Sequence, residues 1–148
     1  MTAATDSMCV VAAARSWLGT PYHDQASLKG VGCDCLGLAR GVWREVVGSE
    51  PFPIPPYSRD WGETGPVEVL AEGARRMMPE IDPAFAEPGA LLLFRMRSCA
   101  IAKHVGIMTA PDRFVHGYER LGVIEQALTP VWRRRIAFAF HFPARDSG

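Results

Sequence analysis

A cysteine and a histidine in this chain have the types and local settings that nucleophilic catalysis requires. Cys35 follows Asp34, a favoured N-cap residue, at the start of a segment with helical spacing of apolar residues. Unpaired N–H groups and the dipole at a helix N-terminus lower the pKa of a thiol. His104 lies in a segment with strand character. The sequence therefore predicts Cys35 as a nucleophile with a depressed pKa and His104 as its base.

A second histidine, His116, lies on the next predicted strand, after a turn at 110–112. This spacing suits neighbouring antiparallel strands, so we expect His116 to orient His104 and fix its tautomer. His104 is predicted to lie mid-strand, where small neighbours on its face leave room for the end of a helix. Those neighbours are Ala102, Gly106 and Met108.

Two other interpretations of these residues stay open. Taken alone, Cys35 fits a small buried hydrophobic residue at a helix start equally well. A metal site is a further alternative, although the Cys-x-Cys spacing is tighter than in common zinc knuckles. Its soft ligands would be Cys33, Cys35, Cys99 and His104.

The chain falls into helical segments followed by strands, which predicts an α+β fold. The spacing of apolar residues predicts helices over 7–18, 35–47 and 67–78, with Cys35 in the first turn of the second. Alternation predicts five strands, with Ile136, Phe138, Phe140 and Phe142 on one apolar face of the last. The strands span 90–96, 101–109, 113–118, 122–128 and 135–142. The segment 50–66 contains five prolines, which indicates a surface loop or insertion and a candidate docking surface.

Composition limits the class of protein. A chain of 148 residues with 48% hydrophobic and 22% charged residues predicts one globular domain over 1–148. Lys plus Arg and Asp plus Glu both number 16, so no net field favours nucleic acid or a membrane surface. The basic run 133–135 is interpreted as a solvated strand entrance. No apolar stretch approaches the roughly 20 residues of a membrane span, and the N-terminus lacks secretory-signal features, so we expect cytoplasmic synthesis and free thiols.

Five short motifs resemble, in order and spacing, the NlpC-type cell-wall cysteine peptidases. More narrowly, they resemble the single-domain forms encoded with phage and gene-transfer-agent tails. The chain departs from the family at Leu36, where the family commonly has Ser, and at Ala90, where it commonly has Asp. The motifs are Gly19-Thr-Pro-Tyr22, Asp34-Cys35-Leu-Gly37-Leu38, Pro88-Gly-Ala-Leu-Leu-Leu-Phe94, His104-Val-Gly-Ile107 and Phe114-Val-His116.

The resemblance implies a papain-like core in which the helix carrying the cysteine packs on an antiparallel sheet of about five strands. It implies Cys35, His104 and His116 as catalytic residues and places Tyr22 beside the nucleophile. Asp34 and Gly37 join Tyr22 as expected substrate-binding residues, because Gly37 has no side chain to keep a substrate backbone away. No metal or organic cofactor is expected.

The resemblance also implies a substrate and a setting. The substrate would be a peptidoglycan stem peptide, cut between γ-D-glutamate and a diamino acid. The enzyme would bind phage-like tail or baseplate proteins after synthesis in the cytoplasm and act at the periplasmic cell wall. The alternative is a catalytically silent structural tail subunit that retains the peptidase fold. Nucleic acid and membrane insertion are not expected.

Overall fold

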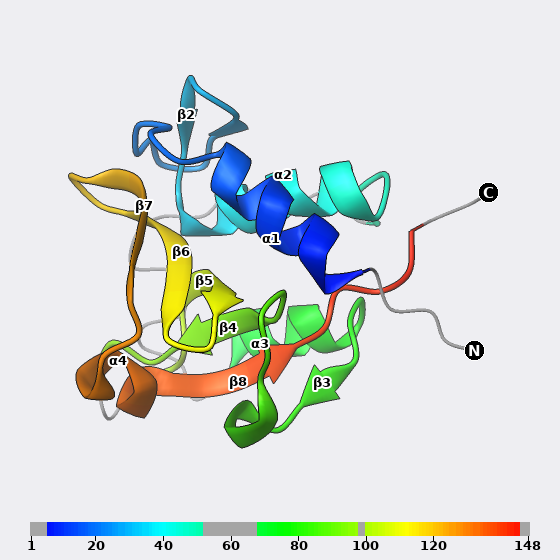
Figure 1. The fold of residues 1–148 in the computed structure, drawn as a ribbon, viewed down its shortest axis with the longest axis vertical. Helices are drawn as coiled ribbons and strands as arrows, with labels where there is room; N and C mark the ends of the chain where they lie inside the picture. The colour runs from blue at the N-terminus through cyan, green and yellow to red at the C-terminus, as the bar shows by residue number, and fades with distance from the viewer. Residues whose placement is uncertain (1–5, 52–67, 98–99, 146–148) are drawn as a thin grey trace.

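The structure, a computed structural model, describes residues 6–51, 68–97 and 100–145. A six-stranded antiparallel sheet has the strand order β3-β8-β4-β5-β6-β7, and β1 and β2 form a separate hairpin. The helices α1 and α2 lie side by side against this sheet (Figure 1). The predicted α+β class is confirmed. The elements are α1 Ser7–Ser16, β1 Ser27–Leu28, β2 Gly32–Cys33, α2 Cys35–Val46, α3 Val69–Arg75, β3 Glu80–Ile81, the 3-10 helix Pro83–Phe85, β4 Leu91–Phe94, β5 His104–Ala110, β6 Arg113–Tyr118, β7 Gly122–Ala127, α4 Pro130–Arg135 and β8 Ile136–Phe140.

The three predicted helices and five predicted strands are present, mostly with shorter ends. The sequence did not predict β3, a two-residue edge strand that pairs with β8. It also did not predict α4, whose last turn contains the basic run 133–135. Arg133 and Arg134 are exposed and the run directly precedes β8, in line with a solvated entrance to the last strand. Helix α4 begins with Pro130 after the N-cap Thr129, whose hydroxyl accepts a hydrogen bond from Trp132 N.

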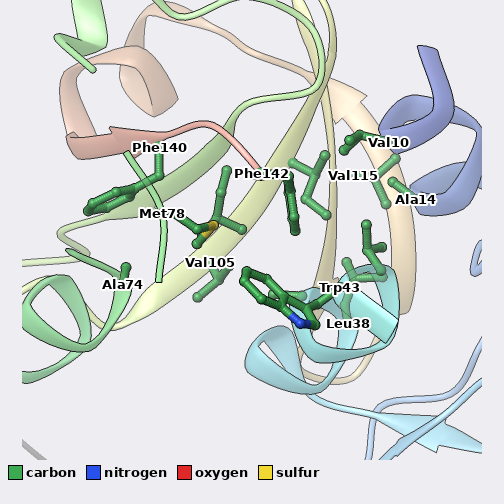
Figure 2. Packing of buried hydrophobic residues seen from close by; sticks show 14 of the residues in the cluster. Val10, Ala14, Leu38, Trp43, Ala74, Met78, Val105, Val115, Phe140 and Phe142 are labelled. Atoms are coloured by element: carbon green, nitrogen blue, oxygen red, sulfur yellow. The ribbon is translucent and has the colours of Figure 1, made fainter. Parts of the chain in front are cut away.

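Apolar residues form two clusters on opposite faces of the sheet. The larger cluster joins α1, α2 and α3 to the sheet, with Val10 and Leu38 packed near Val105 and Val115 (Figure 2). The smaller cluster covers the other face. Its buried members are Ala90, Leu92, Phe94, Met108, Phe114, Leu128, Trp132 and Ala139. Both faces of the central strands are therefore buried, and β4 has no exposed residue.

The last strand departs from the predicted alternation. Phe138 and Phe140 face the larger cluster as expected, but Ile136 packs against the smaller one. The pairing of β4 with β8 shifts register between Leu93 and Phe94, and this bulge moves Ile136 to the opposite face. The prediction that Ile136 shares the apolar face is therefore wrong.

Two predictions concern regions that the structure describes in part or not at all. Most of the proline-rich segment, residues 52–67, lies outside the described residues, and so does the docking surface expected there. Cys99 also lies outside them. Within the described ranges, no helix combines the length and apolar character that crossing a membrane requires.

We predict that Gly41→Ala destabilises the fold, because a Cβ at Gly41 would overlap the ring of Trp17. Trp17 is buried, and its indole N–H donates a hydrogen bond to Glu45, so the ring has little freedom to move. The free energy of unfolding, measured with urea, should fall by about 1–3 kcal/mol.

The matched control is Gly73→Ala in α3, where a Cβ would meet open space. This change should stabilise the helix by about 0.5–1 kcal/mol. Equal effects at the two glycines would contradict the close packing of α1 on α2.

Candidate active site

Asp34 sets the start of α2 and thereby the position of Cys35. Its carboxylate accepts hydrogen bonds from Gly37 N through Oδ1 and from Gln25 N through Oδ2, both at 2.7 Å. Asp34 is the N-cap and Cys35 is the first helical residue, as predicted. The two hydrogen bonds fix the helix end and the preceding loop to the same buried carboxylate.

The start of α2 lies directly on the sheet. A Cβ at Gly117 of β6 would come within 3.2 Å of the carbonyl group of Asp34, so only glycine fits there without displacement. Cys35 Sγ lies 3.9 Å from the carbonyl oxygen of Lys103 and also interacts with the N–H of Val105. The thiol therefore contacts the backbone on both sides of His104.

The surroundings of Cys35 raise its pKa to about 12, chiefly through burial and secondly through the negative charge of Asp34. The backbone N–H groups of Val105, Leu36 and Cys35 act in the opposite direction but do not outweigh burial. The prediction of a depressed thiol pKa is therefore wrong, because the helix end that would stabilise a thiolate is itself covered by the sheet. At neutral pH the resting group is a thiol.

His104 and His116 form a hydrogen-bonded pair on adjacent strands. His104 Nε2 lies 2.7 Å from His116 Nδ1, and His116 Nε2 lies 2.7 Å from Gln126 Oε1 of β7. The pairing expected from the spacing of the two histidines is thus present. The chain of contacts continues one strand further than the sequence indicated.

Aromatic side chains enclose this pair. Trp132 lies across it, with ring centroids 6.0 Å from His104 and 5.2 Å from His116. Tyr118 stacks on His116 with centroids 5.1 Å apart, Phe94 lies 5.8 Å from His104, and Phe114 lies 4.4 Å from His116. The His116 side chain is fully buried and His104 is partly buried.

This enclosure keeps both imidazoles neutral at neutral pH. The pKa of His104 is lowered to about 3, chiefly by burial and then by the charge that a protonated His116 would carry and by the charge of Arg135. The pKa of His116 is lowered to about 4, because burial outweighs the opposing effect of the hydrogen bond to Gln126. A neutral imidazole has one free lone pair, which is the form that a general base needs.

The structure brings Cys35 to the backbone of His104 rather than to its ring. Within the described residues, no hydrogen bond joins Cys35 Sγ to the imidazole. His104 is the first residue of β5, so its expected mid-strand position is wrong, and Ala102 packs in the larger cluster, away from Met108. Catalytic hydrogen bonds in substrate-free enzymes are often long and tighten when substrate binds.

Tyr22, expected beside the nucleophile, forms a bridge with Cys33 and lies near Cys35. Burial, followed by the charge that Cys35 would carry, raises the pKa of its hydroxyl, which donates a hydrogen bond to Asp24 at 3.3 Å. The phenol is therefore neutral, and its single O–H is directed at Asp24. Its contact with substrate stays a prediction.

The structure gives Asp34 and Gly37, both expected to bind substrate, a role in holding the start of α2. Both oxygens of Asp34 accept backbone hydrogen bonds that hold the helix start. A Cβ at Gly37 would overlap the carbonyl of Ala26, so glycine is needed there for an approach of the chain's own backbone. A substrate contact at Gly37 stays a prediction. A substrate contact through Asp34 stays a prediction.

Cys9, Cys33 and Cys35 are free thiols, as expected from the sequence. Cys33 is fully buried in the larger cluster. Across 6–51, 68–97 and 100–145, no three His, Cys, Asp or Glu side chains gather to hold a metal ion. The metal-site alternative therefore gains no support from the described part of its ligand set.

Sequence reasoning missed Gln126 and Trp132. The β6–β7 register pairs Phe114 with Gln126, which puts Gln126 diagonal to His116 on the same face of the sheet. Without that register, the sequence does not show that the two side chains meet. For Trp132, the pair Thr129-Pro130 is a helix-start signal that could have indicated α4.

Solved structures share this architecture. The NlpC/p60 domain of the peptidoglycan hydrolase SagA matches with a TM-score of 0.64 and 23% identity, over 91% of this chain and 97% of that domain. An NlpC/p60 family protein from Bacillus cereus ATCC 10987 matches with a TM-score of 0.63 and 18% identity, over 92% of this chain and 40% of that one. The peptidoglycan hydrolase RipB from Mycobacterium tuberculosis matches with a TM-score of 0.58 and 21% identity, over 93% of this chain and 64% of that one.

This chain thus spans nearly all of the SagA domain and less than two thirds of the other two proteins. No family model and no curated protein matches its sequence. At these identities the likeness establishes the fold: the chain has the NlpC/p60 fold, and the predicted papain-like α+β core is confirmed.

The buried neutral imidazole of His116 should make stability fall with acidity. Its folded pKa lies below the unfolded value near 6.5, so protonation favours the unfolded chain as pH drops below that value, and the loss continues to about pH 4. Between about pH 7 and about pH 4.5 we expect His116 to contribute a loss of roughly 2 to 3 kcal/mol. Urea unfolding at both values, compared between the wild type and His116→Gln, measures it.

Carboxylates that titrate in the same range affect both proteins alike and cancel in this difference. The control His23→Gln, at an exposed loop residue, should keep the wild-type dependence. An equally steep loss in His116→Gln would show that His116 is not buried in its neutral form.

Proposed function

We propose that this chain is a cysteine endopeptidase that hydrolyses peptidoglycan stem peptides. One observation carries the proposal: Cys35 Sγ contacts the backbone on both sides of His104, whose ring is held by His116. A cysteine at a helix start, a base and an orienting residue are the parts of a nucleophilic hydrolase. SagA and RipB, which share the fold, are peptidoglycan hydrolases.

The resting pair is neutral, so proton transfer accompanies attack. As Cys35 Sγ bonds to the substrate carbonyl carbon, the thiol proton passes to His104, which then protonates the leaving amine. The product is an acyl-enzyme, a thioester on Cys35. Water, deprotonated by His104, attacks the thioester and releases the acid while the proton returns to the thiol. The N–H groups of Leu36 and Val105 already point at Sγ and stabilise negative charge there.

The bond that we propose follows γ-D-glutamate and precedes a diamino acid. The support for this finer assignment is the order and spacing of the five motifs that resemble the NlpC-type peptidases. We assign Tyr22 to contact substrate, since its neutral hydroxyl lies near Cys35. No step in this scheme requires a cofactor.

We also propose that the enzyme is carried in a phage-like or gene-transfer-agent tail and acts at the periplasmic cell wall. This part of the proposal rests on the resemblance to tail-encoded peptidases. Its partners would be tail or baseplate proteins. Detection of the chain in purified particles would test this delivery.

A catalytically silent tail subunit is the second candidate. The specific observations in its favour are the raised pKa of Cys35 and the missing hydrogen bond between its thiol and the His104 ring within the described residues. The intact pair of histidines, hydrogen-bonded at 2.7 Å, favours catalysis. Hydrolysis of purified peptidoglycan separates the two candidates.

We predict that Cys35→Ala abolishes the release of peptide fragments from peptidoglycan, measured by chromatography and mass spectrometry. His104→Ala should lower the rate by about 10²–10⁴-fold, because a base takes part in every proton transfer. His116→Ala should cost less than His104→Ala, because it only orients the base.

The control is Cys9→Ala, which removes an exposed thiol on α1 and should leave the rate unchanged. Fragment release by Cys35→Ala at the wild-type rate would reject the assigned nucleophile. A folded wild-type protein that releases nothing would favour the silent tail subunit.

A further inference from the structure

Gln126 ends the hydrogen-bonded chain that begins at His104. Its Oε1 lies 2.7 Å from His116 Nε2, and it comes from β7, where its backbone pairs with Phe114 of β6. The side chain is partly buried. An amide keeps its donor and acceptor atoms at every pH, unlike the imidazoles beside it. Gln126 is therefore the end of the hydrogen-bonded series whose donor and acceptor atoms do not change with pH.

The acceptor at this end determines where each ring proton sits. An amide oxygen only accepts, so His116 must carry its proton on Nε2. Burial keeps His116 neutral, so its Nδ1 is a bare lone pair, and that atom lies 2.7 Å from His104 Nε2. His104 must then donate from Nε2. As a neutral imidazole with one proton, His104 is left with a bare Nδ1.

We propose that Gln126 is a positioning residue that fixes the tautomers of both histidines and so leaves His104 Nδ1 unprotonated as the basic atom. The catalytic consequence rests on the proposed function, whereas the tautomers themselves do not. The hydrogen bond of the Gln126 side chain goes to His116, so Gln126 acts through His116.

An amide suits this position better than a carboxylate. A negative charge beside His116 would stabilise the imidazolium and raise its pKa, as the hydrogen bond of Gln126 already does to a smaller degree. With that raised pKa, His116 would become protonated earlier on acidification, and a protonated His116 has no free lone pair to accept the hydrogen bond from His104 Nε2. Gln126 therefore orients the His116 proton through a hydrogen bond and adds no negative charge.

Glu125, the residue before Gln126 on β7, makes its hydrogen bonds with other partners than the histidine pair. Glu125 accepts hydrogen bonds from Thr109 Oγ1 at 2.6 Å and Arg15 Nη2 at 3.0 Å. Those partners lie on α1 and β5 and are not part of the histidine pair. Isosteric exchange between acid and amide at 125 and 126 therefore gives a matched pair of variants.

A Gln126 amide turned by about 180° predicts the opposite tautomer for each histidine. If its NH₂ group faced His116, then His116 would carry its proton on Nδ1 and donate to His104 Nε2. His104 would be protonated on Nδ1 and could not accept the thiol proton there. The two arrangements differ in the protonation of all four ring nitrogens.

The test uses protein labelled with nitrogen-15 in its histidines and proton–nitrogen correlation spectra at neutral pH. We expect Nε2 of both His104 and His116 to carry the proton and both Nδ1 atoms to be bare. In Gln126→Leu the pattern should be lost, with both tautomers of His116 populated. Gln126→Glu should keep the pattern, and the control Glu125→Gln should match the wild type.

Activity gives an independent readout on peptidoglycan. Gln126→Leu should lower kcat/KM by at least about 10²-fold, because a triad histidine in the wrong tautomer costs about 10⁴-fold in a serine protease. Gln126→Glu should restore most of this rate while moving the acid limb of the pH profile to higher pH. A purely structural role for Gln126 would not move that limb.

A proton on Nδ1 of either histidine in the wild type would overturn the inference, and so would an unchanged pattern in folded Gln126→Leu. The spectra are recorded without substrate. Absence of hydrolysis in every protein would therefore contradict the proposed function, while the spectra alone would still decide the tautomers.

Discussion

The close contact between the start of α2 and the sheet is the constraint on which the site depends. Gly117 lets the backbone of Asp34 and Cys35 approach β6, and the doubly bonded Asp34 carboxylate holds the helix end in that position. This contact places the thiol against the peptide groups around His104. It also partly buries the thiol, so the same packing that forms the site determines its protonation state.

The resting site contains a neutral thiol and a neutral imidazole, and not a thiolate–imidazolium ion pair. Both would be charges in a low-dielectric setting, and the raised pKa of Cys35 and the lowered pKa of His104 disfavour both. Charge must then develop during attack, where the N–H groups around Sγ can stabilise it. Trp132 and Tyr118 pack against His116, and Gln126 forms a hydrogen bond with it.

Local signals in the sequence predicted much of this architecture. The Asp34 cap, the helix that carries Cys35 and the strands that carry His104 and His116 follow from capping residues, periodicity and turn residues. The features that were missed depend on tertiary contacts. Burial reversed the expected pKa of Cys35, a bulge moved Ile136 to the other face, and strand register brought Gln126 to His116. Composition and spacing alone do not contain that information.

The most direct test of the account is to trap the covalent intermediate. A stem-peptide fragment is mixed with the wild-type protein, the reaction is quenched with acid, and the intact protein is weighed by mass spectrometry before peptide mapping. The account predicts added mass equal to the acyl portion of the fragment, attached to Cys35. Product release with no adduct on Cys35, or an adduct that maps to another residue, would contradict it.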